Sequence, residues 1–179
     1  AGMLMIGASA IFPYIVSSGL SFAPASDGGV LAPGMLPFWT ALAAFLILGE
    51  KLDQIRRAGL FVILIGALLV GLWQILFDSD EGVWRGHILF LIGSGLFAVY
   101  SVIFRQSGLT PLHGLLIGLF WGTLFLIPIL LLTGRVNFNN VSALDIGITI
   151  VIQSLIIGIL ATILFNYGVR LIGASEMGA

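Results

Sequence analysis

The sequence predicts an all-α integral membrane protein, a multi-helix transmembrane bundle with an inverted repeat. Apolar residues make up 59% of the chain and charged residues only 8%, which leaves too little polar surface to cover a water-soluble fold. Long apolar segments alternate with short polar connections. Two similar stretches lie an odd number of predicted crossings apart, so they should face opposite sides of a membrane, as in secondary transporters.

Each apolar segment is long enough to cross a hydrocarbon core as a helix, which takes about 20 residues. Charged side chains fall between the segments, as expected because a charge at mid-bilayer costs about 2.5–3.5 kcal/mol. The short connections indicate one bundle rather than several domains. The predicted helices occupy residues 1–22, 30–48, 58–77, 86–104, 112–133 and 146–169.

The inverted repeat emerges when residues 18–30 are aligned with residues 167–179. Acidic Asp27 then matches acidic Glu176, and small residues recur at equivalent positions. Five predicted crossings separate the two copies, so we expect opposite orientations. The identical pairs are Gly19/Gly168, Ala25/Ala174, Ser26/Ser175 and Gly29/Gly178.

The basic residues predict how the chain sits in the membrane. One side receives Lys51, Arg56, Arg57, Arg105 and Arg170, whereas the other receives Arg85 and Arg135. Basic residues gather on the cytoplasmic side of membrane proteins. The loop from Glu50 to Arg57 is therefore predicted to be cytoplasmic, in the cell inner membrane.

Composition also argues against other classes of function. A net charge of −1 gives no concentrated basic face for nucleic acid. The chain contains no cysteine, which removes thiolate metal sites and a cysteine nucleophile. An embedded enzyme would need clustered catalytic groups, which the sequence does not offer. We expect no enzymatic activity, no cofactor and no metal.

Three prolines lie within predicted helices, at Pro13, Pro37 and Pro128. Proline lacks an amide hydrogen and displaces the carbonyl four residues earlier. In lipid, that carbonyl must find a partner or line a wet cavity. Pro13 and Pro37 could bend helices around a central pathway and act as hinges, or neighbouring side chains could satisfy the kinks. Pro33 is expected near a helix start, where proline is ordinary.

The last predicted helix is the best candidate for a surface that faces substrate. Ser154, Gly158, Thr162 and Asn166 recur every four residues, and Gln153 adjoins them. Buried amides are costly unless hydrogen-bonded or wet, so Gln153 and Asn166 should face inward. Both could contact substrate or bond neighbouring helices. The balance favours a pathway role for Gln153 and interhelical bonding for Asn166.

Other residues carry weaker expectations. Tyr14 and Trp39 each lie near a proline bend and are candidate pocket residues. The spacing of Gly114, Gly118 and Gly122 is typical of close helix packing.

Ionisable residues are expected to lie at the helix ends. Asp27 follows a serine in a turn, so capping explains it, and no carboxylate is expected within a crossing. His87 is interpreted as a solvated anchor at the outer interface, with a proton relay as the alternative. Arg105 should complement a helix C-terminus. Glu50 should pair with a cation of its own loop, Lys51, Arg56 or Arg57, with a gate latch as the bolder alternative.

Several sequence elements together resemble a known family. They are the small-residue turn and proline-bearing helix of residues 25–37, the Gly49-Glu50 corner and the glycine-rich helix that closes at Gly71. This arrangement is similar to EamA-type permeases of the drug/metabolite transporter superfamily. The resemblance implies two inverted five-helix repeats, of which this chain would hold about six helices and be truncated at both ends.

The resemblance divides the chain into three parts. Residues 1–77 would be the last three helices of the first repeat, and residues 78–85 an extracytoplasmic linker. Residues 86–179 would be the first three helices of the second repeat and the start of the next.

These observations favour a permease that moves a small metabolite, amino acid or drug-like solute by alternating access. The alternative is a structural or assembly subunit of a membrane complex, which would tolerate the same packing faces but does not need Gln153 at mid-membrane. The expected partners are a small-molecule substrate and the lipid bilayer, with a homodimer left open and no nucleic acid.

Overall fold

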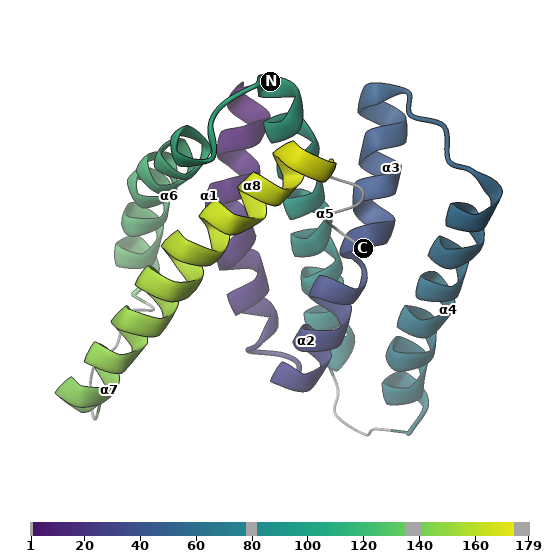
Figure 1. The fold of residues 1–179 in the computed structure, drawn as a ribbon. Coiled ribbons are helices and arrows are strands. Elements are labelled where there is room, and N and C mark those ends of the chain that lie inside the picture. Colours follow the sequence, from purple (N-terminus) through teal and green to yellow (C-terminus); the bar gives the residue numbers. More distant parts are fainter. Residues whose placement is uncertain (1, 78–81, 135–140, 174–179) are drawn as a thin grey trace.

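The computed structural model describes residues 2–77, 82–134 and 141–173, and every element in those ranges is helical (Figure 1). The spans that are long and apolar enough to cross a membrane are Ala25–Leu48, Gln54–Gly71, Val83–Ser107, Pro111–Thr133 and Ala143–Ile172. An all-α membrane bundle is therefore confirmed. In order, the elements are α1 (Gly2–Gly19), α2 (Ala25–Gly34), α3 (Leu36–Leu48), α4 (Gln54–Phe77), α5 (Val83–Ser107), α6 (Pro111–Thr133), α7 (Ala143–Thr149), the π-helical η1 (Ile150–Ala161) and α8 (Thr162–Ile172).

Local sequence explains where several helices begin and end. Gly49, Gly108 and Gly134 follow α3, α5 and α6 with φ of 70°, 65° and 61°, a left-handed conformation that glycine adopts without a Cβ penalty. Thr110 caps α6 by accepting the His113 amide at 3.3 Å. Such caps satisfy backbone groups that a helix end leaves without partners.

The helices extend beyond the predicted segments into polar sequence. The second crossing begins at Ala25 instead of residue 30, and α5 begins at Val83, inside the predicted linker 78–85. The first extension brings Asp27 into a helix, whereas His87 already lay within the predicted segment 86–104. The expectation that no carboxylate would lie within a crossing is therefore wrong for Asp27.

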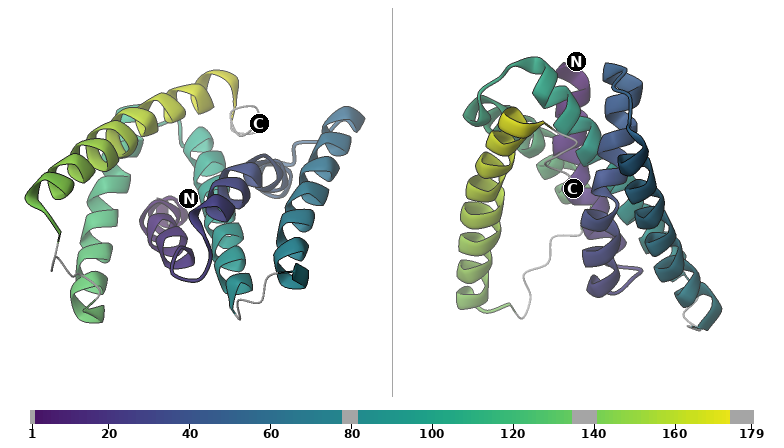
Figure 2. Two further views of the ribbon diagram at one scale, coloured as in Figure 1. Left: turned by 90° about the horizontal axis from the view of Figure 1, so that it is seen from below. Right: turned by 45° about the vertical axis from the view of Figure 1, so that its right-hand side comes forward.

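Helix α5 is the centre of the bundle. It packs against α1, α2, α3, α4 and α8. Figure 2 shows α4 at one edge and α6 with α8 at the other, with α1 and α5 between them. Phe90, Ala98 and Val102 of α5 are fully buried. Small residues allow this density, because a Cβ on Gly93 would lie 2.6 Å from the Val16 side chain.

The outer helices expose apolar side chains, as expected for surfaces that contact lipid. Phe61 and Leu69 of α4 and Leu132 of α6 are among the large hydrophobic residues that are strongly exposed. In water such a surface would favour aggregation or association. In a bilayer the same side chains contact lipid tails, which are as apolar as the side chains.

The second crossing is two helices rather than one bent helix. α2 ends at Gly34 and α3 begins at Leu36, with Met35 between them. Pro37 lies in the first turn of α3, where a missing amide is tolerated, and Pro33 lies inside α2, not near a helix start as predicted. The Met35 amide donates to the carbonyls of Leu31 and Pro33. The carbonyl that Pro37 leaves without its usual donor therefore has a partner.

The other two prolines lie inside continuous helices. Pro13 is within α1 and Pro128 is within α6, and neither helix is divided at its proline. Whether Pro13, Pro37 or Pro128 acts as a hinge stays a prediction.

The two ends of α5 mark the two ends of the bundle. Gly19, at the end of α1, would place a Cβ 3.2 Å from the Gly86 carbonyl, near the start of α5. Gly173, after α8, would place one 3.1 Å from the Arg105 guanidinium, near the end of α5. The ends of α1 and α8 thus lie at opposite ends of the bundle, as the inverted repeat requires. Residues 174–179, which include Ser175 and Glu176, lie outside the described residues.

This orientation gives a direct prediction, made simple by the absence of cysteine. In intact cells expressing the protein, Ser26→Cys should react with a membrane-impermeant thiol reagent, whereas Ser175→Cys should react only after lysis. The cysteine-free protein is the control for background labelling. Labelling of both positions from one side would contradict the inverted repeat.

Candidate functional site

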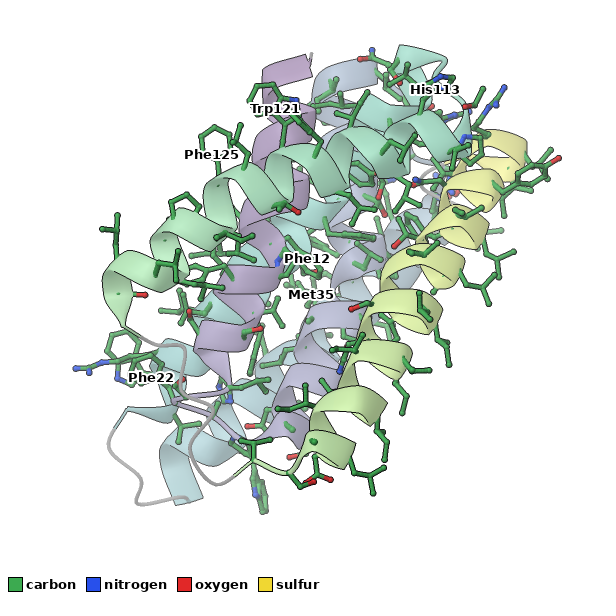
Figure 3. All side chains as sticks on the ribbon, turned by 90° about the vertical axis from the view of Figure 1, so that its left-hand side faces the viewer. Phe12, Phe22, Met35, His113, Trp121 and Phe125 are labelled. Carbon is green, nitrogen blue, oxygen red and sulfur yellow. The ribbon has the colours of Figure 1, made fainter. Side chains whose placement is uncertain are left out.

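A cavity of about 550 Å³ lies among α1, α5, α6, η1 and α8. Aromatic and aliphatic side chains form most of its wall, including Phe12 of α1 and Phe97 of α5. In Figure 3, Phe12 lies toward the interior, whereas Trp121 and Phe125 lie on the outer side of α6. The polar lining comes from neutral side chains, and no charged residue is among the described residues that line it. These neutral groups are Ser17, Tyr100, Thr123, Gln153 and Thr162.

Of the predicted pathway residues, Gln153 and Thr162 line the cavity and Ser154 does not. The π-helical backbone of η1 explains the difference. In a π-helix the backbone amide of each residue donates to the carbonyl five residues earlier. The Thr162 hydroxyl, which follows η1, likewise donates to the carbonyl of Ile157 at 3.4 Å. Gln153 therefore shares a face with Gly158, its fifth neighbour. The predicted four-residue stripe assumed an α-helix, and Ser154 of that stripe does not line this cavity.

Asn166 is fully buried and bonds to α5. Its Nδ2 donates to the Tyr100 hydroxyl at 3.0 Å, and that hydroxyl lies 3.2 Å from Asn166 Oδ1. Asn166 does not line the cavity, but Tyr100 does. The geometry is that of interhelical bonding, the alternative that the sequence favoured for Asn166. Through this bond, Asn166 holds a ring that forms part of the cavity wall.

Tyr14 and Trp39 are not among the cavity-lining residues. Trp39 instead packs against α5, where a Cβ on Gly95 would lie 3.6 Å from its ring. α1 lines the cavity with the neighbours of Tyr14, which are Phe12, Pro13, Val16 and Ser17. The sequence contained a signal for this face, since Phe12 and Val16 are four residues apart on a helix. The expectation that Tyr14 and Trp39 would be pocket residues does not match this cavity.

The glycine face of α6 has two roles. Gly114 packs closely, because a Cβ there would lie 2.5 Å from the Phe104 ring. Gly118 and Gly122 also line the cavity. The absence of side chains on this face leaves room for the cavity while α6 approaches its neighbours.

The predicted ion pair at Glu50 forms, but with a partner from another helix. Arg105 Nη1 lies 2.8 Å from Glu50 Oε1, joining the ends of α3 and α5. The expectation of a partner among Lys51, Arg56 or Arg57 is therefore wrong for the pair that the structure describes. Arg105 was expected only to complement its helix end. The backbone amide of Arg56 donates to Asp53 Oδ1 at 2.7 Å, so the Asp53 carboxylate caps the start of α4.

The Glu50–Arg105 pair should contribute little to stability. Its side chains are 38% and 41% exposed, and ion pairs at this exposure are worth about 0–1 kcal/mol. Glu50→Gln should therefore lower the free energy of unfolding by less than about 1 kcal/mol. Denaturant titration of the protein in mild detergent would measure the change. A much larger loss would indicate a latch rather than a surface pair.

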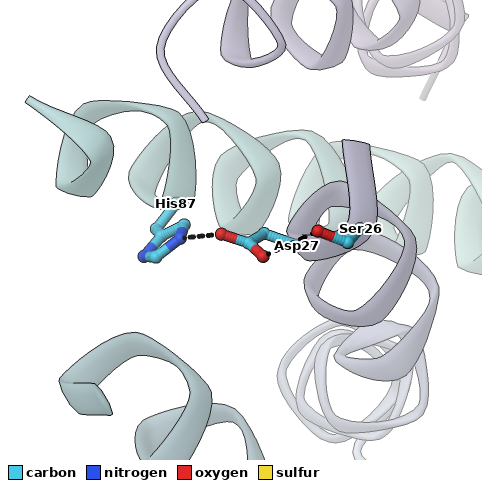
Figure 4. Close-up of polar contacts among 3 residues, drawn as sticks. All are labelled: Ser26, Asp27 and His87. Carbon is cyan, nitrogen blue, oxygen red and sulfur yellow. Dashed lines mark hydrogen bonds and ion pairs between the residues drawn. The ribbon is translucent and has the colours of Figure 1, made fainter. Parts of the chain in front are cut away.

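A second pair of titratable side chains lies buried near the opposite end of α5. His87 Nε2 is 2.8 Å from Asp27 Oδ2, and the Ser26 hydroxyl donates to Asp27 Oδ1 at 3.2 Å (Figure 4). Asp27 and His87 are each only 6% exposed. Asp27 does lie in the first turn of α2, where a carboxylate favours the helix start, but it also bonds to His87. The interpretation of His87 as a solvated anchor is wrong. Their helices pack closely, because a Cβ on Gly28 of α2 would lie 3.0 Å from the Phe90 ring of α5.

Comparison with known proteins gives one informative relationship. Over 156 residues the chain is 28% identical to a protein of Bacillus subtilis (strain 168) described as "Uncharacterized transporter YyaM". The match covers 83% of this chain and 50% of that protein, so the chain spans about half the length of this curated relative. No family model and no solved structure matches the chain.

Proposed function

We propose that this chain forms part of a membrane permease that moves a small, neutral or zwitterionic solute by alternating access. The observation that carries the proposal is the cavity of about 550 Å³, lined by neutral polar groups. Small-molecule sites are typically apolar clefts of about 300–1,000 Å³ with a few placed polar groups. The similarity to a protein described as a transporter supports the same function.

The position of the cavity also suits transport. Phe12, Pro13, Val16 and Ser17 come from the predicted first half, residues 1–77, and the remaining lining residues come from the predicted second half. In secondary transporters the site lies at the interface of repeats, and rocking of one repeat against the other exposes it alternately. An EamA-type architecture would place the site at such an interface, and we propose that architecture here.

Within this site we propose that Gln153 contacts the solute. Its amide offers two donors and a carbonyl acceptor. The residue lines the cavity and is exposed, so a solute can reach the side chain. Thr162, Thr123 and Ser17 supply further hydroxyl groups. Neutral groups of this kind recognise hydroxyl, amide or amino-acid functions without holding a permanent ion.

Gln153→Leu should reduce solute flux by about 5–150-fold with little effect on folding, because losing a polar partner to a bound polar group costs about 1–3 kcal/mol. Ser154→Leu is the matched control, since it lies next to Gln153 but outside the cavity. Flux would be followed in cells or proteoliposomes with the protein, using a panel of labelled amino acids, neutral metabolites and amphipathic dyes.

The control separates transport from an assembly role. Equal flux in Gln153→Leu, Ser154→Leu and the unmodified protein would remove Gln153 from the pathway. If the unmodified protein carries no solute of the panel, and both Gln153→Leu and Ser154→Leu prevent the protein from assembling with a membrane partner, a structural or assembly subunit would be favoured.

A further inference from the structure

We propose that the Asp27–His87 pair is a proton-binding site that controls opening of the cavity. The inference rests on the proposed transport function and assigns it a coupling ion. Asp27 belongs to the predicted first half and His87 to the predicted second half, so the pair joins the two parts that would move. The sequence offered no buried carboxylate, and only the meeting of α2 with α5 creates this site.

The buried geometry gives the pair its chemical character. Asp27 and His87 are almost fully removed from the surface, at a separation of 2.8 Å. A buried charge is costly unless it is paired and hydrogen-bonded. In a membrane protein, an ionisable group at such a place indicates function more often than architecture.

His87 has one ring nitrogen available for a proton. With Nε2–H donating to Asp27, Nδ1 carries a lone pair, and it is buried with no hydrogen-bond partner among the described residues. Uptake of one proton at Nδ1 converts the neutral imidazole to an imidazolium, and no other bond forms or breaks. The Asp27 carboxylate beside it balances the new positive charge.

Few other charges face the pair. On α5, Arg85 is exposed, with its guanidinium 5.6 Å from the Trp84 ring centroid. On α4, Arg56 and Arg57 lie near the start of the helix, whereas the opposite end of α4 leads into α5. The described parts of α1, α2 and α3 contribute one other titratable group, Tyr14 of α1. The acidic residues that precede α5 in the sequence, Asp78, Asp80 and Glu81, lie outside the described residues.

A packed path connects the pair to the cavity. Phe90, one turn beyond His87, covers Gly28 of α2, where a Cβ would lie 3.0 Å from the ring. Gly93, less than two turns beyond His87, packs against Val16, and Val16 lines the cavity. A change in the α2–α5 contact therefore reaches the cavity wall through side chains already in contact.

The test places a reporter cysteine in the cavity of the otherwise cysteine-free protein. Ser17→Cys would be labelled with an impermeant thiol reagent in sealed vesicles of both orientations at about pH 5 and pH 8. Because thiol reactivity itself depends on pH, each rate would be divided by that of an exposed reference cysteine on the side that the reagent reaches. The reference is Ser21→Cys, in the turn after α1, for one orientation and Ser107→Cys, at the other end of the bundle, for the opposite one. We expect the ratio to change at least fivefold, about the lower limit of typical coupling between sites.

Further variants identify the residues responsible. Asp27→Asn and His87→Gln should remove the pH dependence of the ratio. His113→Gln is the matched control and should retain it, since His113 is exposed and bonds to Thr110 near the other end of α5. A pH dependence that persists in both Asp27→Asn and His87→Gln would overturn the assignment.

A measurement on the unmodified protein keeps the proposal testable if the variants do not fold. The chain has two histidines, so ¹⁵N-histidine NMR in nanodiscs can follow both rings, with His113→Gln giving the assignment. The ¹⁵N resonance of His87 Nδ1 should change from that of an unprotonated to that of a protonated ring nitrogen when the sample is acidified. A ring that keeps one protonation state throughout would overturn the proposal.

The outcomes also separate this inference from the proposed function. If Ser17→Cys is labelled from neither side at any pH, the cavity is not a pathway and both proposals fail. If it is labelled from both sides with the same ratio at both pH values, the transport function stands and the proton site fails.

Discussion

Replacing Gly86 with alanine should destabilise the bundle more than any other single methyl addition at a glycine of α5. A Cβ at this position would collide with the Cβ of Ala23 and lie 2.8 Å from the Gly19 carbonyl oxygen. It would also lie 3.0 Å from the Ala23 amide nitrogen. Backbone atoms cannot move aside as the end of a flexible side chain can. The expected loss is about 3 kcal/mol of unfolding free energy, the upper part of the usual range for overpacking.

Gly66→Ala is the matched control, because Gly66 also lies inside a helix but a Cβ there meets nothing within 4 Å. It should be neutral or stabilise by about 0.5–1 kcal/mol through higher helix propensity. Denaturant titration in mild detergent, followed by tryptophan fluorescence, would compare the two variants. Equal effects at both positions would contradict the close contact between α5 and the turn after α1.

Removing one partner of the Asp27–His87 pair should be the second large effect. His87→Leu leaves the Asp27 carboxylate buried, with the Ser26 hydroxyl at 3.2 Å as a weak substitute. Breaking a buried pair in this way costs about 3–5 kcal/mol, whereas replacing both partners with apolar residues is often close to neutral. The double variant Asp27→Leu/His87→Leu should therefore be more stable than His87→Leu alone.

A double-mutant cycle measures this coupling in the same denaturant assay. Groups in direct contact show interaction energies of about 0.5–3 kcal/mol, whereas distant groups add. Strict additivity of Asp27→Leu and His87→Leu would mean that the pair contributes nothing as a pair. A second cycle on the exposed Glu50–Arg105 pair is the control and should give a small coupling.

The sequence predicted the helices well but could not predict which helices meet. Apolar runs are local signals, so the membrane-spanning segments followed from them. Asp27 and His87 are 60 residues apart, and Glu50 and Arg105 are 55 apart. Periodicity identifies the face on which such a residue lies, but not its neighbour. Each was therefore assigned a local role, as a cap or a loop partner, whereas the structure gives each a distant partner.

The cavity shows the same limit in another form. Gln153 was identified because an amide in an apolar helix needs a partner or water, a physical argument that does not depend on helix type. Ser154 was identified by a spacing that holds only for an α-helix. Because η1 is π-helical, the first argument led to a cavity residue and the second did not.

The π-helical stretch also determines how the last crossing is phased about its own axis. One residue corresponds to about 100° of rotation and 1.5 Å of rise in an α-helix, so gaining or losing a single residue in the register of η1 would turn α8 by that angle relative to α7. Asn166, bonded to Tyr100, and fully buried Val169 fix α8 at its present angle. The π-helical stretch is thus the part of this crossing where a change of register would turn α8, and the Asn166–Tyr100 hydrogen bond opposes that rotation. Loss of this bond would allow Gln153 and Thr162 to rotate relative to each other about the helix axis without unfolding either helix.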